Sequence, residues 1–256
     1  MTPHVSSRYP IADPAFRSEC KTAFDEAGAL VLHGFLTPEA VEAVRRDGEN
    51  KIADAYFCAS SHNVYLTPKD SGLPDDHPFN RQVISSKGLI ADDQIDAASP
   101  LKEVYNDADF RSFVSHVVGE GAIHPYADAL SAVNLHFAKA GQELGWHFDN
   151  SSFATTILIQ KPQAGGRFEY VRDLRDSAGG DMNFDGVGSV LDGTTRPDML
   201  EAGPGTLMLF RGRDSLHRVT PTEGGTTRML AVLAYNSQPG ISLSESAMRT
   251  FYGRTA

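Results

Sequence analysis

The second half of the chain alternates apolar and polar residues with a period of two, which predicts half-buried β-strands. The segments with this pattern are 132–139, 145–149, 153–161, 167–172, 205–212, 216–220 and 227–236. Gly165 and Gly166 predict a tight hairpin turn between two of these strands. Residues 173–204 are polar and rich in Gly and Asp, so we expect them to form an insertion.

The first half favours helices. Residues 13–27 fit a helix, and a short apolar run between glycines at 28–34 predicts one strand. A second helix is expected after Thr37, because threonine caps helix N-termini and Pro38 suits the first helical position. The buried side of this second helix could contain Val41, Val44, Ile52 and Tyr56. We also expect a functional loop over residues 63–93 and a further helix over 100–119.

Helices followed by seven or eight short strands predict a mainly β protein with flanking helices. The expected architecture is a double-stranded β-helix, or jelly roll, packed against N-terminal helices. We expect one domain over residues 1–256, with a helical part at 1–131, a jelly-roll core at 132–237 and a C-terminal tail at 238–256.

Composition narrows the classes of partner. The 256 residues carry a formal net charge of −10, which argues against nucleic acid and anionic membranes as partners. There are two cysteines and no long apolar stretch, which favours a cytoplasmic protein without a disulfide framework. The oligomeric state stays open.

The strongest chemical pattern is His147-Phe148-Asp149, because residues i and i+2 of a strand point to the same face. A third ligand would be His217 on a later predicted strand. Two histidines and one carboxylate leave three octahedral positions open, which suits Fe(II) that binds a cosubstrate and dioxygen. A His-x-Asp pair also occurs by chance, so these residues alone predict only a generic metal site.

Arg228 makes the hypothesis more specific. It follows His217 by 11 residues (228 − 217) and lies in an almost wholly apolar strand. A buried guanidinium needs an anion and pairs with a carboxylate through two hydrogen bonds. The distal carboxylate of 2-oxoglutarate fits this role, although a carboxylate of the protein would also satisfy the arginine.

His147, Asp149, His217 and Arg228 together resemble the Fe(II)/2-oxoglutarate-dependent dioxygenase family. The resemblance covers residues 132–236 and implies a jelly-roll fold, with three metal ligands and Arg228 on the distal carboxylate. The strings WHFDNSSFATTILIQ, GGRFEYV, HRVTP and FYGR are similar to a smaller group that acts on free amino acids. That group contains hydroxylases and also halogenases, in which glycine or alanine replaces the metal carboxylate. Asp149 therefore implies hydroxylation.

Residues for the substrate and cosubstrate are less specific. Arg81 in the long loop could bind an amino-acid carboxylate, and Asn150, being neutral, suits a neutral side chain. Val232 could line the pocket, Tyr252 could close it, and Asn134 could touch 2-oxoglutarate. Asn150 could also hydrogen-bond substrate or a metal ligand. The other four residues each have a structural alternative, which is a solvated arginine for Arg81, ordinary core packing for Val232, a surface tail for Tyr252 and a core hydrogen bond for Asn134.

Three functions remain open from the sequence. The first is hydroxylation of an unactivated C–H bond of a small molecule, expected to be a free amino acid with a neutral side chain. The second uses the same Fe(II), 2-oxoglutarate and dioxygen for desaturation, epoxidation or ring closure. The third is a non-catalytic jelly-roll protein that binds a ligand.

Overall fold

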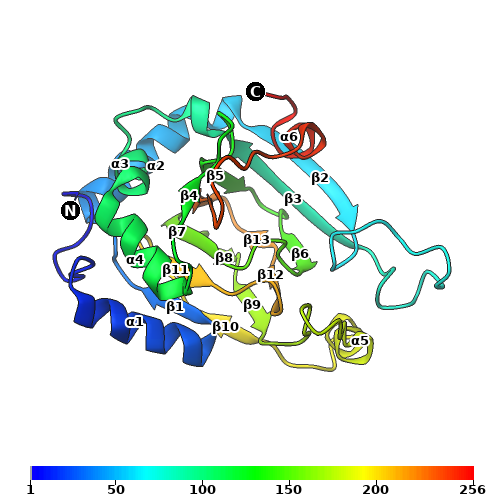
Figure 1. The fold of residues 1–256 in the computed structure, drawn as a ribbon. Helices are drawn as coiled ribbons and strands as arrows, with labels where there is room; N and C mark the ends of the chain where they lie inside the picture. Colours follow the sequence, from blue (N-terminus) through cyan, green and yellow to red (C-terminus); the bar gives the residue numbers. More distant parts are fainter. Residues whose placement is uncertain (1) are drawn as a thin grey trace.

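The computed structural model describes residues 2–256, in which antiparallel strands form the centre and the helices of the first half of the chain cover one side (Figure 1). The helices are α1 (Pro14–Ala27), α2 (Pro38–Lys51), α3 (Pro100–Asn106), α4 (Ala108–Val118), α5 (Phe184–Leu191) and α6 (Glu245–Tyr252). The strands of the first half are β1 (Ala29–Leu32), β2 (Tyr56–His62), β3 (Val83–Ile90) and β4 (His124–Pro125). The later strands are β5 (Val133–Ala138), β6 (Leu144–His147), β7 (Ala154–Gln160), β8 (Ala164–Gly165), β9 (Phe168–Val171), β10 (Asp198–Leu200), β11 (Leu207–Phe210), β12 (Leu216–Val219), β13 (Thr222–Glu223), β14 (Arg228–Leu233) and β15 (Tyr235–Asn236).

The main sheet has the strand order β1-β11-β7-β14-β5-β3-β6-β12-β9-β10, and β2 pairs with β3 at its side. All of these pairings are antiparallel. Strand β3 pairs with β5 through Gly88–Ile90 and with β6 at Ser85, so it links the two halves of the sheet. The jelly roll expected from the sequence is confirmed.

The larger half-sheet consists of β1, β11, β7, β14 and β5, and the smaller half-sheet consists of β6, β12, β9 and β10. The two faces of the larger half-sheet have different surroundings. Phe137 and Leu135 of β5 and Met229 and Ala231 of β14 point outward and join the main hydrophobic core with residues of α1 to α4. Figure 1 shows these helices along one side of the sheet. The alternate residues of the same strands, Arg228 and Leu230 among them, therefore point to the inner face. This face is where a ligand can bind.

The predicted helix starts are confirmed. The Asp13 side chain accepts a hydrogen bond from the Ala15 backbone N–H, and Thr37 caps α2 through the N–H of Ala40. One expectation was wrong: α2 ends at Lys51, and Tyr56 begins β2 with 40% of its surface exposed instead of lining the helix. A 3₁₀ turn at Ile52–Asp54 separates the two elements.

The expectation of a loop over residues 63–93 was wrong in its last third. Residues Val83–Ile90 form β3, which pairs with three other strands. The serines and Gly88 suggested a loop, but Gly88 lies in the sheet because the ring of Phe57 occupies the space of its missing side chain. The insertion at 173–204 also contains regular structure, α5 and β10.

Helix α6 covers the inner face of β2 and β3 near the C-terminus (red in Figure 1). Its Met248 and Tyr252 pack with Leu89, Ala91 and Leu130 in a separate hydrophobic cluster. The residues expected to be a tail thus close one end of the sheet. Within residues 2–256, no helix has the length and apolarity needed to span a membrane.

Candidate metal and cosubstrate site

Three predicted metal ligands converge on the inner face of the smaller half-sheet. His217 on β12 lies directly opposite His147 on β6, and Asp149 follows β6 by two residues. The Asp149 Oδ1 atom lies 3.8 Å from His147 Nε2 and 3.6 Å from His217 Nε2. One ligand atom from each residue lies within 4.8 Å of the others, so the cluster could hold a metal ion.

Both imidazole rings are held in one tautomer by the backbone. His147 Nδ1 donates to the Gly145 carbonyl at 2.7 Å, and His217 Nδ1 donates to the Ser215 carbonyl at 2.9 Å. Because each Nδ1 carries the hydrogen, each Nε2 has a free lone pair that faces Asp149. The rings of Phe210 and Phe168 contact the His217 ring, with centroids 4.9 and 5.5 Å away, and fix its plane.

Asp149 fits a metal ligand because its second oxygen is unsatisfied. Asp149 Oδ2 is buried and has no hydrogen-bond partner among the described residues, which is costly unless a cation binds there. Gly212 makes room for this carboxylate, since a Cβ at that position would lie 1.9 Å from Asp149 Oδ2. The Gly212 carbonyl also accepts a hydrogen bond from the Asp149 N–H at 3.0 Å.

The protonation states also suit a metal. Burial, together with the neighbouring His217, lowers the pKa of His147 to about 3, so the ring is neutral at physiological pH. Burial opposes ionisation of Asp149, but His217 and His147 more than offset it and hold the carboxyl pKa below its ordinary value. Neutral imidazoles and an ionised carboxylate are the forms that bind divalent metals. The three residues present therefore fit Fe(II).

Arg228 lies on the inner face with only 9% of its surface exposed. Among the described residues it has no ion pair or hydrogen bond, and burial lowers its pKa to about 10, which leaves it charged. The alternative role foreseen for Arg228, a salt bridge to a protein carboxylate, is therefore not formed in residues 2–256.

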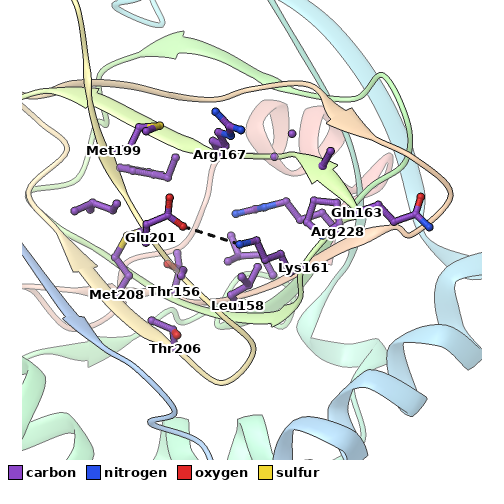
Figure 2. A pocket seen from close by; sticks show the side chains of 18 residues that line it. Thr156, Leu158, Lys161, Gln163, Arg167, Met199, Glu201, Thr206, Met208 and Arg228 are labelled. Carbon is purple, nitrogen blue, oxygen red and sulfur yellow. Dashed lines mark ion pairs between the residues drawn. The ribbon is translucent and has the colours of Figure 1, made fainter.

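Arg228 points into a cavity of about 460 Å³ between the two half-sheets (Figure 2). The inner wall contains Leu158, Leu230 and Phe168, and Phe168 also contacts the His217 ring. Arg228 and the metal-ligand cluster therefore lie on the two sides of Phe168, which borders the cavity and contacts His217. At its rim, Lys161 Nζ lies 4.0 Å from Glu201 Oε2, the pair marked by the dashed line in Figure 2.

Two more ionisable residues lie on the inner face, and the sequence predicted no role for one of them, Lys87. Lys87 on β3 and His136 on β5 share a small cavity with Arg228. Burial and the two nearby cations lower the pKa of His136 well below its ordinary value, so it is neutral. The alternation of Val83, Ser85, Lys87 and Leu89 was the available signal for Lys87, and the expectation of a loop there concealed it.

Asn134 and Tyr252 bind each other. The Tyr252 hydroxyl donates to Asn134 Oδ1 at 2.7 Å, and Asn134 Nδ2 donates to the Leu130 carbonyl at 2.8 Å. The amide of Asn134 thus anchors α6 to β5. Its expected contact with 2-oxoglutarate stays a prediction, and so does closure of the pocket by Tyr252.

The other predicted substrate residues differ in their exposure and in their contacts. Val232 lies opposite Asn134 on the inner face of β14. Asn150 is exposed, and its carbonyl accepts a hydrogen bond from Arg213 at 3.0 Å. Arg81 Nη1 lies 2.6 Å from the Asp192 carboxylate just after α5, so the long loop and the insertion are joined by this ion pair.

Comparison with known proteins now decides the family. The sequence profile of the family described as Halogenase D matches residues 12–252. The chain belongs to the Halogenase D family. A comparison of this sequence with curated proteins found no match.

Solved structures share the fold of this Halogenase D family member. The α-ketoglutarate-dependent epimerase SnoN from nogalamycin biosynthesis is 10% identical, with a TM-score of 0.59 over 88% of this chain and 83% of that one. A Trichoplax adhaerens prolyl hydroxylase is 13% identical, with a TM-score of 0.56 over 87% and 90%. A Pseudomonas putida prolyl-4-hydroxylase is 11% identical, with a TM-score of 0.52 over 84% and 96%.

The family, the shared fold and the His-Asp-His cluster confirm the class expected from the sequence. The chain is an Fe(II)/2-oxoglutarate-dependent oxygenase. Its neighbours in fold include enzymes named for epimerisation, hydroxylation and, in the case of SnoK, carbocycle formation. The fold alone therefore does not select the substrate or the type of product.

Proposed function

We propose that this oxygenase hydroxylates an unactivated C–H bond of a small molecule, a free amino acid with a neutral side chain. His147, Asp149 and His217 would hold Fe(II), and Arg228 would hold the distal carboxylate of 2-oxoglutarate. The observation that carries the assignment is the unpaired, buried Arg228 in a cavity bordered by Phe168, whose ring contacts His217. Fe(II) with 2-oxoglutarate and dioxygen supplies the oxidant when bound.

The residues of the chain contribute placement and exclusion of water. The backbone carbonyls of Gly145 and Ser215 aim the two Nε2 lone pairs, so the metal site is preorganised. A guanidinium fixes a carboxylate through two parallel hydrogen bonds, which would orient the cosubstrate between Arg228 and the metal. Leu158, Leu230 and Phe168 provide an apolar wall along that path. No general base is needed from the protein.

The family description names halogenation, but Asp149 favours hydroxylation. A carboxylate ligand leaves three octahedral positions, and a chelating keto acid with dioxygen would fill them. A halide would need a vacant position that Asp149 takes. Gly212 supports this assignment, because it leaves space for the Asp149 carboxylate that a larger side chain would block.

Arg81 supports an anionic substrate. It already binds a carboxylate, that of Asp192, which is 59% exposed and can be exchanged at the surface. The carboxylate of an amino acid would take the same place on the guanidinium. Val232 on the inner face is apolar and suits a neutral side chain, and Asn150 lies at the outer side of the ligand cluster.

The experiment is a screen of the free amino acids for succinate formation with Fe(II), 2-oxoglutarate and dioxygen. At least one amino acid with a neutral side chain should raise succinate formation and gain one oxygen atom by mass spectrometry. With that amino acid, Arg81→Gln should raise KM by about tenfold, since a hydrogen bond to a charged group contributes about 1.5–3 kcal/mol.

The matched control is Arg46→Gln, which removes an arginine that is 70% exposed on α2 and should leave KM within about twofold. A chlorinated product in the presence of chloride would contradict the hydroxylase assignment. A product lacking two hydrogens would replace it by desaturation or ring closure.

A further inference from the structure

Lys87 is a cation placed where an apolar side chain would be expected. It lies in β3 between Ser85 and Leu89, and Leu89 is directly opposite His136 on the inner face. Because side chains alternate along a strand, Lys87 points to that same face. It is therefore inside the jelly roll with the metal-ligand cluster and Arg228.

The Lys87 ammonium has no ion pair or hydrogen bond within residues 2–256. Burial lowers its pKa to about 8, and the ring of Phe251 lies near the ammonium, with its centroid 5.7 Å from Nζ. An unpaired cation in such a place is costly to the folded state. The cost is understandable if an anionic ligand completes the site.

The side chains of Lys87 and Arg228 border the same small cavity from neighbouring strands. Gly88 pairs with Phe137, so the next position, Lys87, lies beside Ala138 of β5, and Ala138 pairs with Arg228 of β14 on its other side. Two strand spacings separate the two backbones, about 10 Å, which two long side chains can bridge around one carboxylate. Both residues line one small cavity with Ala138, Leu230 and Val219.

The balance of charge agrees with this arrangement. The one carboxylate that acts on Lys87 from within the site is Asp149, which the metal would engage. Lys87, Arg228 and a divalent metal together outnumber that single negative charge. 2-Oxoglutarate would bring two carboxylates, one to the metal and one to the cations.

We propose that Lys87 is a second cation for the cosubstrate and binds its distal carboxylate together with Arg228. The inference rests on the proposed function, since it takes 2-oxoglutarate as the ligand of Arg228. It makes Lys87 a determinant of specificity: the pocket favours keto acids with a second carboxylate over those with an apolar end. An apolar side chain at this position would be more stable without ligand, and binding of the ligand offsets the cost of the Lys87 charge.

The test compares two ligands in two proteins by calorimetric titration with Mn(II) in place of Fe(II). The ligands are 2-oxoglutarate and 2-oxopentanoate, which has the same keto acid end but lacks the distal carboxylate. Lys87→Met should weaken 2-oxoglutarate binding by about tenfold or more and change 2-oxopentanoate binding by less than about twofold. Without ligand, Lys87→Met should raise Tm by about 2 °C or more, because a half-buried, unpaired charge is removed.

Lys69→Met is the control, because Lys69 is an exposed loop lysine paired with Asp75 and should alter neither affinity. Lys87→Gln, which keeps a polar group without charge, should give the same pattern and guards against a folding defect of the first variant. Equal weakening of both ligands, or of neither, would overturn the role of Lys87. Failure of the wild-type protein to bind 2-oxoglutarate with Mn(II) would instead overturn the proposed function.

Discussion

Replacing His147 by alanine is expected to abolish metal binding and turnover together. Its Nε2 is one of three ligand atoms in a preorganised cluster, and its Nδ1 is committed to the Gly145 carbonyl. Even loss of a partner behind a metal ligand costs about 10–100-fold in affinity or activity, so loss of the ligand itself should exceed about a hundredfold. Iron content by elemental analysis and uncoupled succinate formation are the two measurements.

The control for this prediction is His116→Ala on α4, an exposed histidine outside the site. It should retain both the iron content and the activity of the wild-type protein. His217→Ala should behave like His147→Ala, because the two rings lie opposite each other and both face Asp149. Normal iron content in either ligand variant would mean that the metal binds elsewhere.

Arg228→Gln is expected to have the second largest effect, on 2-oxoglutarate affinity and not on metal content. Removing one partner of a buried charged pair costs roughly 2–5 kcal/mol, which corresponds to about 30- to 5,000-fold in Kd. The neutral amide cannot reproduce the two parallel hydrogen bonds of the guanidinium. Calorimetric titration with 2-oxoglutarate in the presence of Mn(II) measures this change directly.

Arg167→Gln is the matched control, because Arg167 lines the same cavity but is exposed at its rim (Figure 2). Exposed charges contribute about 0–1 kcal/mol, so the Kd should rise by at most about fivefold. If the two variants lost affinity to the same extent, binding would depend on the charge of the cavity as a whole. The specific pairing of Arg228 with the distal carboxylate would then be wrong.

The sequence was sufficient for the residues whose geometry follows from local spacing. His147 and Asp149 are two positions apart, and the period of a strand alone places them on one side. Arg228 stood out because a charge in an apolar strand requires an anion. The jelly roll followed from the number and length of alternating segments, and the family comparison agrees.

Other features depend on contacts between distant segments, which no local pattern contains. Strand β3 reads as a loop because its serines and glycine disfavour a strand in isolation, but β2, β5 and β6 supply its pairing. Because this segment was expected to be a loop, the inward position of Lys87 was not predicted from the sequence. Gly212 lies 63 residues after Asp149 (212 − 149), and its role becomes visible only when the missing Cβ is placed against that carboxylate.

The residues predicted to bind substrate or cosubstrate show the same limit. Arg81 was expected to be free for a ligand, and its pairing with Asp192 arises because α5 of the insertion lies against the long loop. Asn134 and Tyr252 were separate predictions, and the fold joins them by a hydrogen bond. Each position was identifiable as polar and near the site, but its partner was not.

The most direct test of the account is an anaerobic titration of the wild-type protein with Fe(II) and then 2-oxoglutarate, followed by visible absorption. We expect a weak charge-transfer band that needs both additions, saturates at one equivalent of iron and decays when dioxygen is admitted. The same titration of His217→Ala should give no band. A band of full strength in that variant, or none in the wild-type protein, would contradict the assignment of this site.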